Sequence, residues 1–134
     1  MSSKEKSFAV AKVNVNSELT WKFNMKANIE DAVLAFTLGE EKKAKKLLME
    51  ILEDNPESIE AWRALAEVLL SLNHFEDAEK ACRQALNLNS NDLASMVSLS
   101  RILVRLGDKD GAEKATAKAR ILGWKEELAN EDPS

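Results

Sequence analysis

The side chains that could carry out chemistry are few in this chain and do not cluster in the sequence. His74 is the only histidine and Cys82 is the only cysteine. A metal site needs several ligands at compatible spacing, and a catalytic histidine needs a nucleophile or a carboxylate directed at it. We therefore predict that His74 lies at a solvent-exposed turn. We predict that Cys82, on the apolar face of a helix, is a small buried hydrophobic residue.

The glycines and acidic residues also argue against an enzymatic site. All four glycines fall at or near predicted helix ends and form no phosphate-binding loop: Gly39, Gly107, Gly111 and Gly123. The acidic residues are scattered over helix surfaces, where they can pair with lysines, as Glu41 can with Lys45. Because no constellation of catalytic groups is visible, the sequence predicts a protein that is not an enzyme and needs no cofactor.

The charge distribution narrows the classes of partner. The net charge is −4, and no segment has the clustered Lys and Arg that a nucleic-acid footprint requires. The lysines within positions 42–46 are flanked by glutamates, which favours a solvated helix face. No apolar run approaches the roughly 20 residues of a membrane helix, and no secretion signal stands out. We expect a cytoplasmic protein without nucleic-acid or membrane partners.

The most informative pattern is a repeat with a period of 34 residues. One set of turn residues recurs at this interval: Gly39, Asn73 and Gly107. A set of alanines follows each turn at the same interval: Ala44, Ala78 and Ala112. The tetrapeptide Ala-Glu-Lys-Ala at 78–81 recurs unchanged at 112–115. Periods of this length indicate stacked structural repeats, which usually form binding surfaces.

Each repeat contains two stretches whose apolar residues recur at three- and four-residue spacing, the pattern of a helix with one buried face. Asn24 is expected to cap the first helix and Gly39 to end it. The second helix is expected from about Glu40 to Glu53. Gly123 is expected to end the sixth helix, and residues 124–128 to form one further short helical turn.

Six helices in three equal pairs cannot each bury an apolar face alone, so stacking of the pairs is required. The predicted fold is all-α: an α-solenoid of three helix-turn-helix repeats with a short N-terminal extension and a short C-terminal cap. The extension is residues 1–22, the solenoid is residues 23–128, and residues 129–134 form a disordered tail. The repeats are expected at about 25–58, 59–92 and 93–126.

These residues resemble the tetratricopeptide repeat (TPR), over roughly residues 25–126. The middle unit matches the family pattern best, at Trp62, Leu65, Ala66, Leu69, Phe75, Ala78 and Ala85. The end units depart from it, as end repeats that cap a stack are expected to do. Asn28 and Met96 stand where Trp is usual, Asp31 stands where Leu is usual, and Trp124 stands where Pro is usual.

The resemblance implies that the first helix of each pair lines a concave groove. The partner-binding residues carried over to this chain are Ile29, Val33, Phe36, Arg63, Glu67, Leu70, Val97, Arg101, Val104 and Arg105. Arginine holds carboxylates through two-pronged hydrogen bonds, so a peptide with apolar and acidic residues is the expected ligand. The alternative is that these arginines are only solvated or paired with Glu67 and nearby acids.

One TPR subfamily binds the C-terminal carboxylate of major chaperones through Lys, Asn and Arg side chains at five groove positions. This chain departs from that pattern at all five: Ile29, Val33, Ala64, Ala94 and Ser98. The resemblance therefore implies a groove without that carboxylate clamp.

The resulting prediction is a non-catalytic adaptor that binds a peptide segment of a partner protein in the concave groove. Two alternatives remain open: a self-assembling scaffold whose exposed end repeats stack between subunits, and a small secretion-type chaperone that masks an apolar segment. The run from Phe8 to Val15 is disordered, occupies the groove as an internal ligand, or forms a β-ribbon with a second subunit. Trp21 and Trp124 are expected to cover the two ends of the stack.

Overall fold

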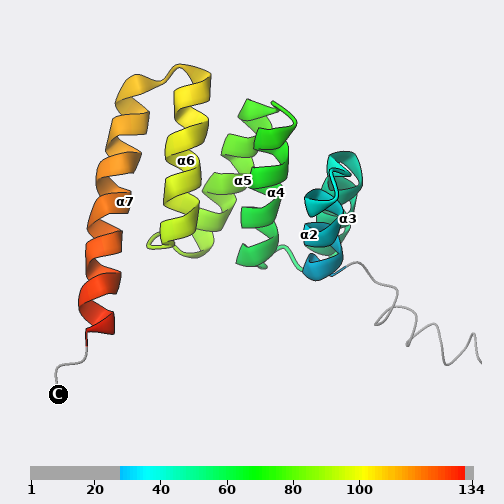
Figure 1. The fold of residues 1–134 in the computed structure, drawn as a ribbon, viewed down its shortest axis with the longest axis horizontal. Coiled ribbons are helices and arrows are strands. Elements are labelled where there is room, and N and C mark those ends of the chain that lie inside the picture. Colours follow the sequence, from blue (N-terminus) through cyan, green and yellow to red (C-terminus); the bar gives the residue numbers. More distant parts are fainter. Residues whose placement is uncertain (1–27, 132–134) are drawn as a thin grey trace, which may run out of the picture.

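The computed structural model describes residues 28–131, and over this range it contains helices and no strand. The helices are α2 (Ile29–Thr37), α3 (Glu41–Asp54), α4 (Ile59–Ser71), α5 (Phe75–Leu88), α6 (Leu93–Leu106) and α7 (Lys109–Asn130) (Figure 1). The predicted all-α class is confirmed. The predictions for Trp21 and for residues 8–15 lie outside the described residues.

Consecutive helices form antiparallel pairs that stack along one direction: α2 with α3, α4 with α5, and α6 with α7 (Figure 1). Each helix packs chiefly against its neighbours in the chain, and α4 also contacts both α2 and α6. The first helices of the three pairs therefore share one side of the stack. This arrangement is the predicted helical solenoid, and its period is that of the sequence, since α3, α5 and α7 begin at equivalent repeat positions.

The recurring turn residues have a backbone conformation that explains their types. Gly39, Asn73 and Gly107 have φ angles of +84°, +64° and +81°. In this left-handed region a side chain with a Cβ is disfavoured, and Gly and Asn are the residues that adopt it at least cost. Each of these residues reverses the chain between the two helices of a pair, which is why the turn position repeats so regularly.

The first helix of the described chain begins later than the sequence predicted. Asn28 caps α2: its Oδ1 accepts a hydrogen bond from the Asp31 backbone N–H at 2.8 Å. The predicted cap, Asn24, lies outside the described residues. Ser58 and Asp92 cap α4 and α6 in the same way. An N-cap of this kind satisfies a backbone donor that the helix itself leaves unpaired.

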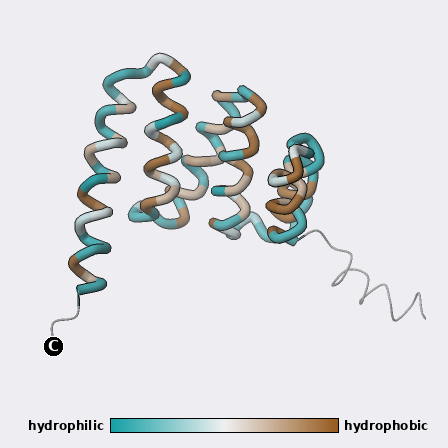
Figure 2. Tube along the Cα trace, viewed as in Figure 1, coloured by the Kyte–Doolittle hydropathy of each residue, from teal (hydrophilic) through white to brown (hydrophobic). Residues whose placement is uncertain are grey.

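The core is built from small residues where helices cross and larger ones between them. The repeated alanines Ala44, Ala78 and Ala112 are all buried, and Leu48, Val68 and Ile102 are among the most buried large side chains. Small side chains let helix backbones approach closely, and the branched residues fill the remaining space. Brown apolar stretches alternate with teal polar ones along the helices in Figure 2, as one-sided burial requires.

The last helix differs from the prediction at its C-terminal end. α7 continues through Gly123 to Asn130, giving 22 residues where α3 and α5 have 14. Its end extends past α6 (Figure 1). Trp124 was expected to cover the end of the stack, but it is exposed, as are Ile121 and Leu128. These three side chains recur at helical spacing and form a stripe on the outer face of α7.

No helix among residues 28–131 combines the length and apolar character needed to cross a membrane.

Candidate functional site

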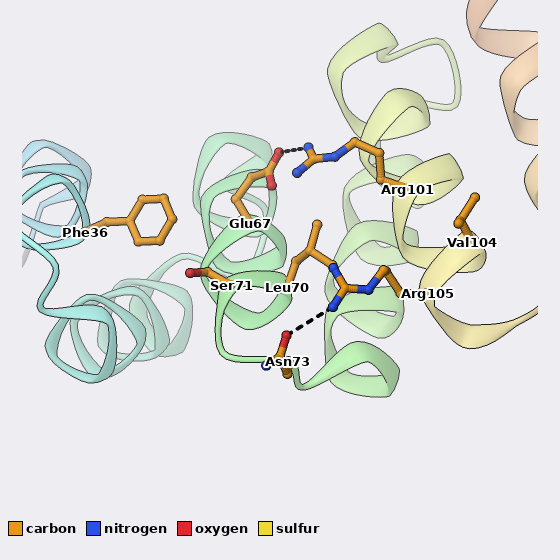
Figure 3. Close-up of a pocket in the computed structure, with 8 residues that line it drawn as sticks. All are labelled: Phe36, Glu67, Leu70, Ser71, Asn73, Arg101, Val104 and Arg105. Atoms are coloured by element: carbon orange, nitrogen blue, oxygen red, sulfur yellow. Dashed lines mark hydrogen bonds and ion pairs between the residues drawn. The ribbon is translucent and has the colours of Figure 1, made fainter.

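A cavity of about 900 Å³ lies on the side of the stack that α2, α4 and α6 share (Figure 3). It is lined by Phe36, Glu67, Leu70, Ser71, Asn73, Arg101, Val104 and Arg105. Phe36 comes from α2, Glu67 to Ser71 from α4, and the last three from α6. Asn73 comes from the turn between α4 and α5. The cavity therefore spans all three repeats.

The structure brings together six of the residues that the sequence assigned to the groove: Phe36, Glu67, Leu70, Arg101, Val104 and Arg105. The other four do not line this cavity. Val33 and Val97 are exposed on α2 and α6, and Ile29 is half-buried against the core. Two further residues line the cavity. The sequence assigned Asn73 only to a turn, whereas Ser71 is a groove-face position of the second repeat outside the ten partner-binding residues.

Arg63, the remaining predicted residue, has a structural partner. Its Nε lies 3.0 Å from Asp92 Oδ2, and the same carboxylate caps α6 by accepting from the Ser95 backbone N–H at 3.1 Å. Arg63 thus links α4 to the first turn of α6. This is the pairing with nearby acids that the sequence left open as the alternative for the arginines.

Arg101 and Glu67 form an ion pair across the interface between α6 and α4. Arg101 Nη1 is 2.8 Å from Glu67 Oε1 (Figure 3). Ser98 Oγ donates to the same oxygen at 3.1 Å. Because a guanidinium has five N–H donors, this pair leaves donors on Arg101 that face the cavity or solvent. Arg101 can therefore hold a second carboxylate without losing Glu67.

Arg105 is held more loosely than Arg101. Its guanidinium carbon lies 4.6 Å from the centroid of the Phe75 ring, within the range of a cation–π contact. Its Nη2 reaches Asn73 Oδ1 at 3.5 Å, at the long limit of a hydrogen bond (Figure 3). Because no carboxylate of residues 28–131 lies within ion-pair distance of it, Arg105 is the cation in the cavity best able to accept an anionic ligand.

Three side chains of the cavity lining are apolar, one from each of α2, α4 and α6. Phe36 points from α2 toward α4, where Leu70 lies at the base, and Val104 lies on the α6 side (Figure 3). Specific ligand sites combine apolar lining with a few placed polar groups. This cavity therefore offers an apolar contact surface beside two arginines, a combination suited to a side chain and a carboxylate of one peptide.

The two residues singled out for chemistry do not contribute to the site. His74 is exposed and is the N-cap residue before α5, and no group of three or more potential metal ligands occurs among residues 28–131. Cys82 is buried, as predicted, and its Sγ donates to the Ser95 carbonyl oxygen at 2.9 Å. Burial raises the pKa of the Cys82 thiol from 9.0 to about 12, and the charge of Glu67 adds to this effect.

The Cys82 thiol should report opening of the contact between α5 and α6. Thiol reagents attack the thiolate, so a buried thiol with a raised pKa is expected to react only when that contact opens. We expect labelling near neutral pH to be at least a hundredfold slower than that of an unfolded chain. The rate is measured with a chromogenic disulfide reagent. Equal rates for Cys82 and for an exposed cysteine, introduced as Ser90→Cys in a Cys82→Ala background, would contradict this.

The Cys82 thiol should also make the free energy of unfolding depend on pH in the alkaline range. Below about pH 9 the folded and unfolded chains both keep the thiol proton, so titration of Cys82 contributes no pH dependence there. Between about pH 9 and pH 12 the unfolded chain loses this proton and the folded chain keeps it. The free energy of unfolding should therefore fall as pH rises through this window, and Cys82→Ala should remove that part of the decrease.

Comparison with known proteins agrees with the architecture. The tetratricopeptide repeat family model matches residues 35–99. Residues 35–99 are therefore identified as tetratricopeptide repeats. The match covers the middle repeat, the best match to the TPR pattern by sequence, and parts of the two repeats beside it. No curated protein sequence matches the chain.

Solved TPR structures resemble the chain in fold. The TPR2B domain of yeast Sti1 in complex with pHsp70 is 22% identical with a TM-score of 0.70, covering 80% of this chain and 87% of that one. The second TPR of Spaghetti (RPAP3), bound to the HSP90 peptide SRMEEVD, is 18% identical with a TM-score of 0.68, covering 69% and 86%. PcrH in complex with the chaperone binding region of PopD is 21% identical with a TM-score of 0.66, covering 68% of each chain.

Proposed function

We propose that this TPR protein is a non-catalytic adaptor that binds a peptide segment of a partner protein in the cavity across α2, α4 and α6. The observation that carries the proposal is the composition of that cavity, which places Phe36, Leu70 and Val104 beside Arg101 and Arg105. An apolar ligand side chain would contact the first three residues. A ligand carboxylate would bind the arginines through charge-assisted hydrogen bonds.

The partners that Arg101 and Arg105 already have indicate which of the two would contribute more to ligand binding. Glu67 already neutralises much of the charge of Arg101 at 2.8 Å, so a ligand carboxylate near Arg101 is also repelled by Glu67. Arg105 has only a neutral amide and an aromatic ring as described partners. We therefore assign Arg105 as the principal contact for a ligand carboxylate and Arg101 as a secondary one.

The peptide ligands named for the similar structures support a peptide as the class of ligand. They do not transfer in detail, because this chain lacks the chaperone-carboxylate clamp at its five groove positions. Ile29 is half-buried against the core and Val33 is an exposed apolar residue, so neither offers the polar contact of that clamp. The proposed ligand is therefore an internal or terminal segment with apolar and acidic residues, and not a chaperone tail bound in that manner.

The test of this function is a peptide-library selection with the intact chain, followed by affinity measurements on the selected peptides. We expect the peptides to combine apolar and acidic residues, and Arg105→Glu to weaken them at least tenfold, about 1.4 kcal/mol. Arg120→Glu is the matched control, because it makes the same charge change at an exposed position of α7 away from the cavity. Arg63 is left unchanged because it supports α6.

Two results would count against the proposal: no enrichment of any peptide, or equal affinity loss for Arg105→Glu and Arg120→Glu. Selection of purely apolar segments that Arg105→Glu does not weaken would favour the chaperone-type alternative instead. In that case Val104→Asp, which changes an apolar residue of the cavity lining, should reduce binding while the arginine changes do not.

A further inference from the structure

The three repeats allow the same position to be compared in different surroundings. At the C-terminal end of the stack, Val104 on α6 stands at the repeat position of Leu70 on α4. Leu70 is 7% exposed because α6 packs beside it, whereas Val104 is 62% exposed. On the second helices, Thr116 of α7 is exposed and stands at the position of Cys82, which is buried under α6. The edge formed by α6 and α7 therefore lacks the cover that α6 gives the preceding pair.

At the N-terminal end of the stack, α2 exposes an apolar residue whose equivalents in α4 and α6 are buried. Leu34 of α2 stands at the repeat position of Val68 and Ile102, and it is 58% exposed where Ile102 is 0% exposed. In α4 and α6 this position faces the preceding pair of helices. Leu38, the last apolar residue of the same face, is also exposed. The outer face of α2 thus carries the apolar residues that later repeats bury.

We propose that α2 of one copy of this chain packs on the edge formed by α6 and α7 of a second copy, as α6 packs on α4 and α5 within the chain. Each end exposes apolar residues at the positions that the internal interfaces bury. The repeat itself fixes the register of the contact. This inference does not depend on the proposed peptide ligand.

A second cavity lies where the proposed contact would form. It has a volume of about 250 Å³ and lies between α6 and α7, with Val104, Gly107, Ala112 and Thr116 in its lining. One repeat earlier, Leu106 lies beside the turn residue Asn73 and beside Phe75. Its equivalent, Leu38 of the incoming copy, would lie beside Gly107. Leu34 would then lie over Ala112 and Thr116 and fill this cavity.

Charge also favours the pairing of unlike ends. Within the chain, Ser98 of α6 donates to Glu67 of α4. At the proposed contact the equivalent residues are Glu30 of the incoming copy and Arg101 of the receiving copy. Their charges are opposite, and Arg101 keeps donors beyond its pair with Glu67. The hydrogen bond from Ser98 to Glu67 at the internal interface would thus correspond to an ion pair between Glu30 and Arg101 at the proposed contact.

A contact between two different surfaces leaves one free end on each copy. Such heterologous association continues into a ring or an open chain of subunits and does not stop at a dimer unless the ring closes there. The chain of 134 residues has a mass of 14.9 kDa. We expect its average mass in sedimentation to rise with concentration.

The test uses two variants, each of which places a charge in one of the two proposed contact surfaces: Leu34→Asp on α2 and Val104→Asp on α6. Both positions are exposed, so the variants should fold, which circular dichroism checks. Each variant alone should be monomeric, since every contact needs both ends. An equimolar mixture should form dimers and nothing larger, because each variant retains the end that its partner lacks.

Three outcomes would overturn the proposal. One is a wild-type chain that stays monomeric up to about 1 mM, where a contact of millimolar Kd would already show. Another is a mixture of the two variants that remains monomeric. The third is association lost in Trp124→Glu but kept in Leu34→Asp, which would place the contact on the outer stripe of α7.

Discussion

Replacement of Ile102 with alanine is expected to lower the free energy of unfolding by about 2–5 kcal/mol. Ile102 is among the largest fully buried side chains in the described chain, at the centre of α6. Its removal loses the apolar transfer energy of three carbon atoms and leaves a cavity that the neighbouring helices fill only in part. Urea denaturation followed by far-UV circular dichroism measures the change, and the midpoint should fall at an unchanged slope.

Leu34→Ala is the matched control for this experiment, because Leu34 occupies the same repeat position in α2. Leu34 is exposed, so we expect a loss within about 0.5 kcal/mol when the chain is dilute enough to be monomeric. Equal losses for the two variants would show that the repeat position, and not its burial, decides stability. That result would contradict the packing described here.

Ala78→Leu should be the second strongly destabilising substitution. Ala78 is fully buried in α5 where it crosses its neighbours, and its type recurs at this position in all three repeats. Three added carbon atoms would force the helices apart or push neighbouring side chains off their preferred rotamers. Overpacking of this kind typically costs about 1–3 kcal/mol, and the tight helix crossing places Ala78 at the upper end of that range.

Ala112→Leu provides the comparison, because Ala112 is the equivalent residue at the open end of the stack. It borders the cavity of about 250 Å³ between α6 and α7, so a larger side chain has room there. We expect Ala112→Leu to cost at least about 1 kcal/mol less than Ala78→Leu in the same denaturation experiment. A larger loss for Ala112→Leu would mean that this space is not available to a side chain.

The regular part of the fold could be predicted from the sequence because one local requirement recurs in each repeat. A positive φ angle is needed at each turn within a pair, and only Gly39, Asn73 and Gly107 supply it at low cost. With those turns located, the apolar spacing between them determines which helix faces are buried. Burial of Cys82 follows from the same spacing.

The ends of the stack could not be predicted in the same way. Asn24 and Asn28 are both good helix caps, and the sequence offers no means of choosing between them. Gly123 costs a helix only about 1 kcal/mol, and the residues after it are good helix formers, so α7 continues. Trp124 is then carried past α6 and remains exposed.

The candidate site was predictable to the level of the helix face. The family pattern identified the face that α2, α4 and α6 share. It could not distinguish Arg63, paired with Asp92, from Arg105, which has no acidic partner in the part of the chain that the structure describes, because both occupy first-helix positions. That distinction depends on contacts between repeats, such as the one from Arg63 to the cap of α6, which the spacing within one repeat does not specify.

If the groove binds a peptide as proposed, the short first helix would link its affinity to the docking of α2. α2 has nine residues, and its fully buried side chains are only Ala32 and Ala35, so little apolar area holds it against α3 and α4. A ligand that contacts Phe36 can bind tightly only to molecules in which α2 is docked. Its apparent Kd is then the intrinsic Kd divided by the docked fraction, and any partner that secures α2 from outside raises affinity without touching the ligand.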